Sequence, residues 1–222
     1  MQTKAEKLLL EEDIKYVRKN RPNMEYIESL EKKIEFYLKR EPHDEDMWIK
    51  YALFEAGMPL KDTSKAVEIL GGLINYNPNN VKAMLIMADL QSLDLGGVDN
   101  KLFEKLTQAK VENKEDTAMI ALVISWFYSQ KDNEYNEEKW LKKSILLGPK
   151  LSYNFILLGK LYFEKGDEEK GKHYMKIGLN NITNQSIDHL NEVDKYINEF
   201  IKGLNRTAEY IDYIKEEYGI AN

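Results

Sequence analysis

The 222-residue sequence contains no cysteine, only three histidines and only five prolines. The absence of cysteine excludes disulfide bonds, thiol nucleophiles and thiolate metal sites, and it is typical of proteins in a reducing compartment. No apolar run approaches the roughly 20 residues that a transmembrane helix requires, so we expect neither a membrane span nor a signal peptide. These absences predict a cytoplasmic protein with no membrane partner.

Residues that commonly carry catalysis or bind metals and phosphates are sparse and scattered. None of His43, His173 and His189 pairs with another histidine at helical spacing, whereas a metal site needs three or four converging ligands. Gly71-Gly72 and Gly96-Gly97 lack the lysine and the preceding strand of a phosphate-binding loop. We therefore predict that the protein is not an enzyme, and that it has no catalytic residue, no metal site and no cofactor.

Charged residues make up 32% of the chain, and the 38 acidic residues exceed the 32 basic ones, which gives a net charge of −6. A nucleic-acid-binding protein normally concentrates Lys and Arg on one face. Here residues 63–185 balance at 16 acidic and 16 basic side chains, which argues against a nucleic-acid partner. The acidic cluster at 43–46 is typical of a solvated helix start, because carboxylates stabilise the positive end of the helix dipole.

Two series of residues repeat in step along the chain. A small residue recurs every 34 to 37 residues, at Ala52, Ala88, Ser125 and Gly159. Large apolar residues recur every 34 to 36 residues, at Leu70, Leu106, Leu141 and Met175. Since the residues three or four positions away from each are apolar or small, each series predicts one helix per repeat, and the small residue lets a neighbouring helix approach closely.

Prolines mark the ends of these repeats. Pro42, Pro78 and Pro149 follow the second predicted helix of a unit, and proline ends a helix because it lacks an N–H and disfavours helical geometry at the preceding residue. Each unit is therefore a predicted helical hairpin. No segment shows the alternation of a strand, so the predicted fold class is all-α.

The pattern resembles the tetratricopeptide repeat (TPR), whose units are two antiparallel helices of about 34 residues. The best match is 152–185, with Phe155, Leu158, Gly159, Tyr162, Gly171, Met175 and Gly178 in the family's positions. Glu55 and Gln91 depart from the pattern, because they stand where the family usually has an aromatic residue. The resemblance implies a right-handed superhelical solenoid of helical hairpins with capping helices at both ends.

The same resemblance divides the chain into a repeat region and two caps. Residues 1–44 form an N-terminal helical pair, either a cap or a degenerate repeat, and residues 186–222 form C-terminal capping helices. Between them, residues 45–185 form four hairpins, at 45–80, 81–117, 118–151 and 152–185.

In TPR proteins the first helix of each hairpin lines the concave groove. The corresponding partner-binding residues are Lys82, Leu85 and Asp89 in the second hairpin, Met119, Leu122 and Trp126 in the third, and Tyr153, Ile156, Lys160 and Phe163 in the fourth. Of these, Trp126, Tyr153 and Phe163 are expected to share one surface. The groove is apolar and lacks the paired Lys and Asn that clamp a peptide's terminal carboxylate.

The resemblance implies a non-enzymatic module that binds a protein or peptide partner in the groove, with a secretion chaperone or a toxin antidote (immunity protein) among its roles. The alternative is a regulatory or enzyme-accessory protein that binds a small ligand or nucleic acid there. The sequence leaves two alternative occupants of the groove open. One is an external partner, and the other is the chain's own terminal helix, expected at 207–218.

Overall fold

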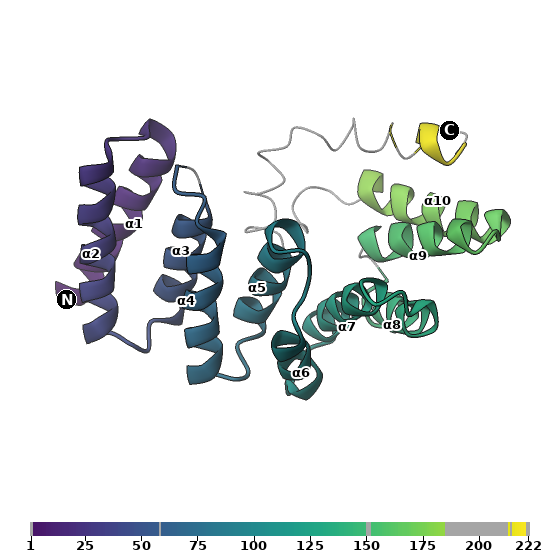
Figure 1. The fold of residues 1–222 in the computed structure, drawn as a ribbon, viewed down its shortest axis with the longest axis horizontal. Helices are drawn as coiled ribbons and strands as arrows, with labels where there is room; N and C mark the ends of the chain where they lie inside the picture. Colours follow the sequence, from purple (N-terminus) through teal and green to yellow (C-terminus); the bar gives the residue numbers. More distant parts are fainter. Residues whose placement is uncertain (1, 58, 150–151, 185–212, 214, 221–222) are drawn as a thin grey trace. The chain divides into compact units, whose positions relative to one another are not determined.

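The computed structural model describes residues 2–57, 59–149, 152–184, 213 and 215–220, and Figure 1 shows their arrangement. All regular secondary structure in these residues is helical, as predicted. The chain divides into two compact units, Met1–Val111 and Glu112–Asn222.

The described residues of the first unit form six helices. In chain order they are α1 (Gln2–Asn20), α2 (Met24–Arg40), α3 (Glu45–Ala56), α4 (Thr63–Tyr76), α5 (Val81–Asp94) and α6 (Asn100–Gln108). Helices α3 and α4 lie side by side as a hairpin (Figure 1), and α4 also packs against α5. Apolar side chains of α1, α2 and α3 share one core, which includes Val17, Ile27, Ile34 and Met47.

The second unit contains α7 (Lys114–Ser129), α8 (Glu134–Leu147), α9 (Ser152–Glu164) and α10 (Glu168–Asn184). Helices α7 and α8 form one hairpin, and α9 and α10 form another (Figure 1). Helix α7 begins at Lys114, within the range 81–117 that the repeat pattern assigns to the preceding hairpin. Tyr213 and residues 215–217 are also helical. The capping helix expected at 187–202 lies outside the described residues.

Short polar side chains start most of these helices. In α2 to α8 the residue before the helix accepts a hydrogen bond from the backbone N–H three residues on, which satisfies one of the unpaired donors of the first turn. These residues are Asn23, Asp44, Asp62, Asn80, Asp99, Asn113 and Asn133. Asp44 belongs to the acidic cluster at 43–46, so this cluster is a helix start, as predicted.

Helix ends follow the predicted proline pattern. Pro42, Pro78 and Pro149 each stand two residues after the last residue of α2, α4 and α8. Gly96 and Gly97, between α5 and α6, have φ angles of +80° and +132°. Such angles favour glycine, which explains why the pair occurs in this turn.

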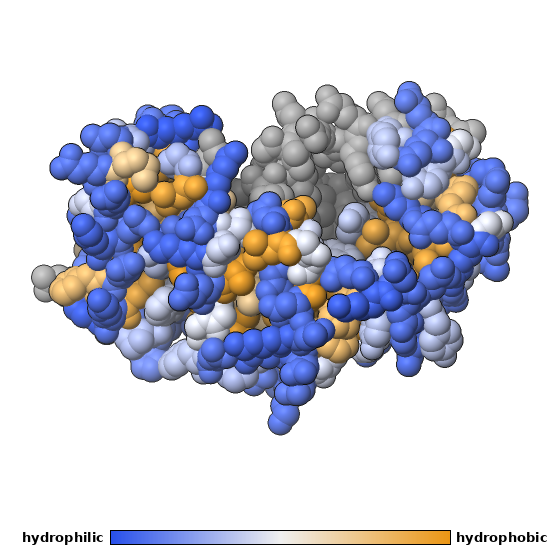
Figure 2. Space-filling view, viewed as in Figure 1, coloured by the Kyte–Doolittle hydropathy of each residue, from blue (hydrophilic) through white to orange (hydrophobic). Residues whose placement is uncertain are grey.

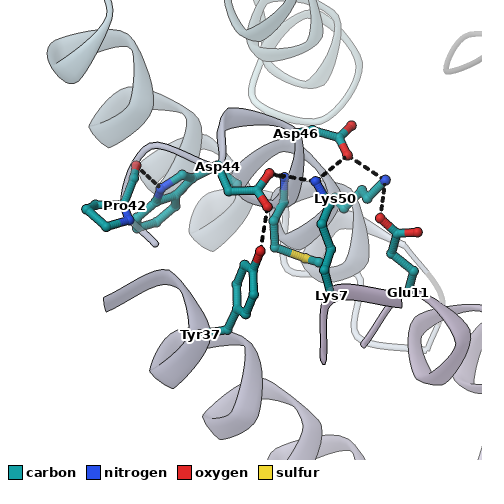
Figure 3. Close-up of polar contacts among 9 residues, drawn as sticks. Lys7, Glu11, Tyr37, Pro42, Asp44, Asp46 and Lys50 are labelled. Atoms are coloured by element: carbon teal, nitrogen blue, oxygen red, sulfur yellow. Dashed lines mark hydrogen bonds and ion pairs between the residues drawn. The ribbon is translucent and has the colours of Figure 1, made fainter. Parts of the chain in front are cut away.

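Ion pairs attach α1 to the start of α3, as Figure 3 shows. Lys7 Nζ lies 2.7 Å from Asp44 Oδ1 and 3.1 Å from Asp46 Oδ2. Lys50 Nζ lies 2.6 Å from the same Asp46 oxygen and 2.7 Å from Glu11 Oε1. Lys7 therefore joins α1 to two carboxylates at the start of α3, and Lys50 joins α3 to Glu11 of α1. Each such partly exposed pair contributes about 0.2–1 kcal/mol.

Asp44 combines two structural roles. Besides capping α3, it accepts a hydrogen bond of 2.7 Å from the Tyr37 hydroxyl (Figure 3). Burial alone would raise the pKa of the Asp44 carboxyl, but the hydrogen bonds from Lys7 and Tyr37 outweigh burial and lower it. The ionised carboxylate is therefore the form that the folded state favours.

The two polar residues that stand where the TPR pattern has an aromatic, Glu55 and Gln91, have polar partners at the following helix. Glu55 is 1% exposed, and its Oε1 lies 2.8 Å from Lys65 Nζ, which also lies 2.5 Å from Glu31 Oε1. Gln91 Nε2 donates to Asp99 Oδ2 at 2.7 Å, and its Oε1 accepts from the Asp99 N–H at 3.1 Å. Glu55 therefore contacts a side chain of α4, and Gln91 contacts the N-terminal cap of α6.

Burial places Glu55 in an unusual ionisation state. Desolvation, with the neighbouring Glu31 carboxylate, outweighs the attraction of Lys65 and raises the pKa of Glu55 to about 7. The two carboxylates compete for one ammonium group, so protonating one of them relieves their repulsion.

Glycines allow α9 and α10 to pack closely. A Cβ added at Gly159 would lie 2.5 Å from Met175 Cγ and 3.0 Å from the Gly171 carbonyl oxygen. One added at Gly171 would lie 2.5 Å from the Phe163 ring, and one at Gly178 would lie 2.8 Å from an Ile156 side-chain carbon. The close helix approach predicted at Gly159 is therefore present.

Candidate functional site

The predicted partner-binding residues of the second unit lie on the first helices of its two hairpins. On α7 these are Met119, Leu122 and Trp126, spaced by three and four residues so that they follow one side of the helix. Met119 and Leu122 are buried, and Trp126 is half-buried. Of the three side chains, only that of Trp126 therefore exposes much of its surface to solvent.

Trp126 meets Tyr153, the first of the predicted residues on α9. The two rings lie edge to face, with centroids 6.3 Å apart and an interplanar angle of 82°. This geometry suits the electron distribution of aromatic rings, because the positive edge of one faces the negative face of the other. Tyr153 is 45% exposed. The pair is therefore an accessible aromatic surface assembled from two helices.

The other predicted residues of α9 are arranged differently. Ile156 is 0% exposed and belongs to a cluster with Met175 and Leu179 of α10 and with Ile220. The Phe163 ring lies with its centroid 4.9 Å from that of Tyr218. Lys160 is half-buried. Of the three aromatics expected to share a surface, the structure pairs Trp126 with Tyr153, whereas Phe163 contacts the C-terminal residues.

In the first unit the predicted residues follow one side of α5. Lys82 is exposed, while Leu85 and Asp89 are half-buried. Burial, together with the nearby charge of Asp94, raises the pKa of the Asp89 carboxyl to about 6. This side of α5 is therefore mixed in polarity.

Ile220 is the site residue that sequence reasoning missed. The terminal helix expected at 207–218 includes Tyr218 but not the two residues that follow it. A glycine directly after a helix, followed by an apolar residue, is typical of a helix end that folds its next residue back onto protein. The sequence Tyr218-Gly219-Ile220 carries that signal.

The described residues contain no group of three or more His, Asp and Glu side chains that could hold a metal ion. Among their helices, none is long and apolar enough to cross a membrane.

Several solved structures resemble this chain. A thermophilic TPR protein from Thermus thermophilus superposes with a TM-score of 0.56 at 16% identity, over 81% of this chain and 93% of that one. The chain has the TPR fold. PilW, a type IV pilus biogenesis factor, matches with a TM-score of 0.60 at 15% identity, over 98% of this chain and 96% of its own.

MamA from Desulfovibrio magneticus RS-1 also has this fold, with a TM-score of 0.58 at 14% identity over 83% of this chain and 97% of its own. The structural similarity establishes the TPR fold. At identities this low, it does not establish a function. No family model matches the sequence, and no curated protein matches it.

Proposed function

We propose that this TPR-fold chain is a non-enzymatic module that binds a protein or peptide partner, and that the Trp126–Tyr153 pair anchors the partner. The observation that carries the proposal is the edge-to-face contact of these two rings at an accessible surface. Both residues occupy positions that line the groove in the TPR repeat. Large aromatic residues dominate the binding energy of protein interfaces, because they bury much area at little entropic cost.

The composition supports a partner of opposite charge. The net charge is −6, and Figure 2 shows a largely hydrophilic face with smaller apolar patches. An acidic protein attracts basic partners over several ångströms and speeds their association. A cytoplasmic secretion chaperone, or an antidote that holds a basic toxin inactive, fits this combination of acidic charge and aromatic anchor.

The test compares partner capture by three forms of the full chain. Tagged wild type, Trp126→Ala and Tyr135→Ala serve as bait in a lysate of the native cell, and mass spectrometry quantifies the captured proteins. Tyr135 is a matched control, because it is a tyrosine of the same unit that is 77% exposed. Losing a buried aromatic anchor costs about 2 kcal/mol or more, which corresponds to roughly 30-fold weaker binding.

We expect Trp126→Ala to lose a protein that wild type and Tyr135→Ala both capture. Far-UV circular dichroism should show the same helical content for all three forms. If Trp126→Ala retains every protein that wild type captures, the aromatic pair is not the docking site.

A further inference from the structure

Two carboxylates of the first unit share one ammonium group. Glu31 lies on α2 and Glu55 on α3, and both reach Lys65 of α4. Lys65 Nζ lies 2.5 Å from Glu31 Oε1 and 2.8 Å from Glu55 Oε1. Two negative charges therefore meet a single positive charge at the point where α2 contacts the hairpin of α3 and α4.

The Glu55 side chain is the more deeply buried of the two. It is 1% exposed, against 16% for the Glu31 side chain. Lys65 donates a hydrogen bond to Glu31 Oε1, whereas the buried Glu55 Oε1 accepts none from the described residues. Burying an ionised carboxylate without a hydrogen bond is so costly that such a group keeps its proton instead. The geometry therefore assigns the proton to Glu55, and the ion pair to Glu31 and Lys65.

The other polar groups around Glu55 do not supply a second positive charge. Glu35 of α2 accepts a hydrogen bond of 2.9 Å from the Tyr51 hydroxyl of α3. Asp62, just before α4, donates its backbone N–H to the Glu55 carbonyl oxygen at 2.8 Å. Arg18 of α1 donates to a backbone carbonyl oxygen of α3 at 3.3 Å. Glu55 is therefore surrounded by more acidic groups than one ammonium can neutralise.

We propose that the proton on Glu55 stabilises the attachment of the N-terminal helical pair, α1 and α2, to α3 and α4, and that this attachment weakens when the proton is lost. With the helices attached, loss of the proton leaves two carboxylates facing one ammonium. When α2 moves away, Glu31 leaves with it and water reaches Glu55. The repulsion and the desolvation cost then both disappear.

The pKa of Glu55 gives the direction of this pH response. Burial first, and then the neighbouring Glu31 carboxylate, outweigh the attraction of Lys65 and raise this pKa from 4.5 to about 7. A group whose pKa is raised in the folded state stabilises that state fully below its ordinary pKa, and this contribution is lost as the pH rises through the raised value. The attachment is therefore tightest in mild acid and weakens as the pH rises through about 7.

Apolar packing determines how far the attachment can weaken. Met47, Tyr51 and Phe54 of α3 are buried in one core with apolar side chains of α1 and α2. This core still holds the helical pair in place when the proton is lost. The pH response is therefore a shift in a local opening equilibrium, and such openings are detected by the hydrogen exchange of backbone amides.

The experiment measures hydrogen exchange of the full chain at pH 6 and pH 8.5 by mass spectrometry. Protection factors, which correct for the chemical effect of pH on exchange, are compared helix by helix. In wild type, the protection of α1 and α2 should fall by about tenfold between these pH values, as expected for one proton with a pKa of about 7 in the attached state and 4.5 in the open state. Protection of α7 to α10, in the second unit, should stay the same.

Three variants identify the group that responds. Glu55→Gln is neutral at both pH values, so its protection should not change with pH. Glu31→Gln removes the competing charge and leaves Lys65 to Glu55, so the fall should shrink to about threefold or less. Glu28→Gln is the matched control, because Glu28 is an exposed carboxylate of α2 one turn before Glu31. It should show the same fall as wild type.

Carbon-13 NMR of the glutamate carboxyl groups observes the proton in wild type itself, so the test does not depend on a variant that folds. One carboxyl signal should titrate near pH 7, and this signal should be missing from Glu55→Gln. The proposal is wrong if every carboxyl signal titrates below about pH 5.5, or if Glu55→Gln shows the same fall in protection as wild type. An equal fall in α5 and α6 would also overturn it, because the proton would then stabilise the whole unit and not the attachment.

Discussion

Replacing Gly159 by alanine tests the closest helix contact of the second unit. The added methyl group would meet Met175 Cγ at 2.5 Å and the Gly171 carbonyl oxygen at 3.0 Å. The Met175 side chain can move, but the Gly171 oxygen belongs to the backbone of α10, so the helices must shift apart. Overpacking of this kind costs about 1–3 kcal/mol.

Replacing glycine by alanine also stabilises the helix itself, and this gain has to be measured separately from the packing cost. Alanine is about 1 kcal/mol better than glycine in a helix interior. Gly72, within α4, provides the matched control, because an added Cβ there meets nothing within 4 Å. We therefore expect Gly72→Ala to raise the free energy of unfolding by up to about 1 kcal/mol, while Gly159→Ala lowers it or leaves a smaller gain.

The difference between the two variants should be about 1–3 kcal/mol in urea unfolding followed by circular dichroism. Because the glycines lie in different units, hydrogen exchange should also show faster exchange of α9 and α10 amides in Gly159→Ala alone. Gly159→Leu should show a larger effect, since its side chain is longer. Equal stabilisation by the two alanine variants, or an unchanged melting temperature in Gly159→Leu, would refute the close packing.

Two further predictions concern the carboxylates of the first unit. The folded state holds a proton on Glu55 up to about pH 7, whereas the unfolded state releases it near 4.5, so its contribution to stability falls as the pH rises between these values. Glu55→Gln should therefore be about 1–3 kcal/mol more stable than wild type at pH 8 and nearly equal at pH 4.5, in urea titrations at both pH values; an identical difference at both would contradict the argument. Asp44→Ala should lose about 1–3 kcal/mol at pH 7, from the helix cap and the Lys7 and Tyr37 hydrogen bonds. Since its pKa is lowered, this loss should disappear as the pH falls below 3.8, and a loss that persists there would assign the effect to packing.

Much of this fold could be predicted from the sequence because its signals are local. Helical spacing, an Asn or Asp before a helix, and a proline two residues after one act within a few residues of the backbone that they shape. The repeat of small residues added the close approach at Gly159, because a repeated spacing places equivalent residues of successive hairpins in equivalent contacts. The TPR fold followed from these patterns.

Contacts between residues far apart in the sequence were decided only by the tertiary structure. The pKa of Glu55 is raised because the side chain is buried and lies near Glu31, which is on another helix. No local sequence pattern predicts that arrangement. Likewise, Ile156 and Tyr153 lie on the same helix, and both were predicted to line the groove. Yet Ile156 is buried against α10, while Tyr153 is exposed beside Trp126. Ile220 covers Ile156 across 64 residues of sequence, because burial depends on which surfaces meet in three dimensions and not on spacing along one helix.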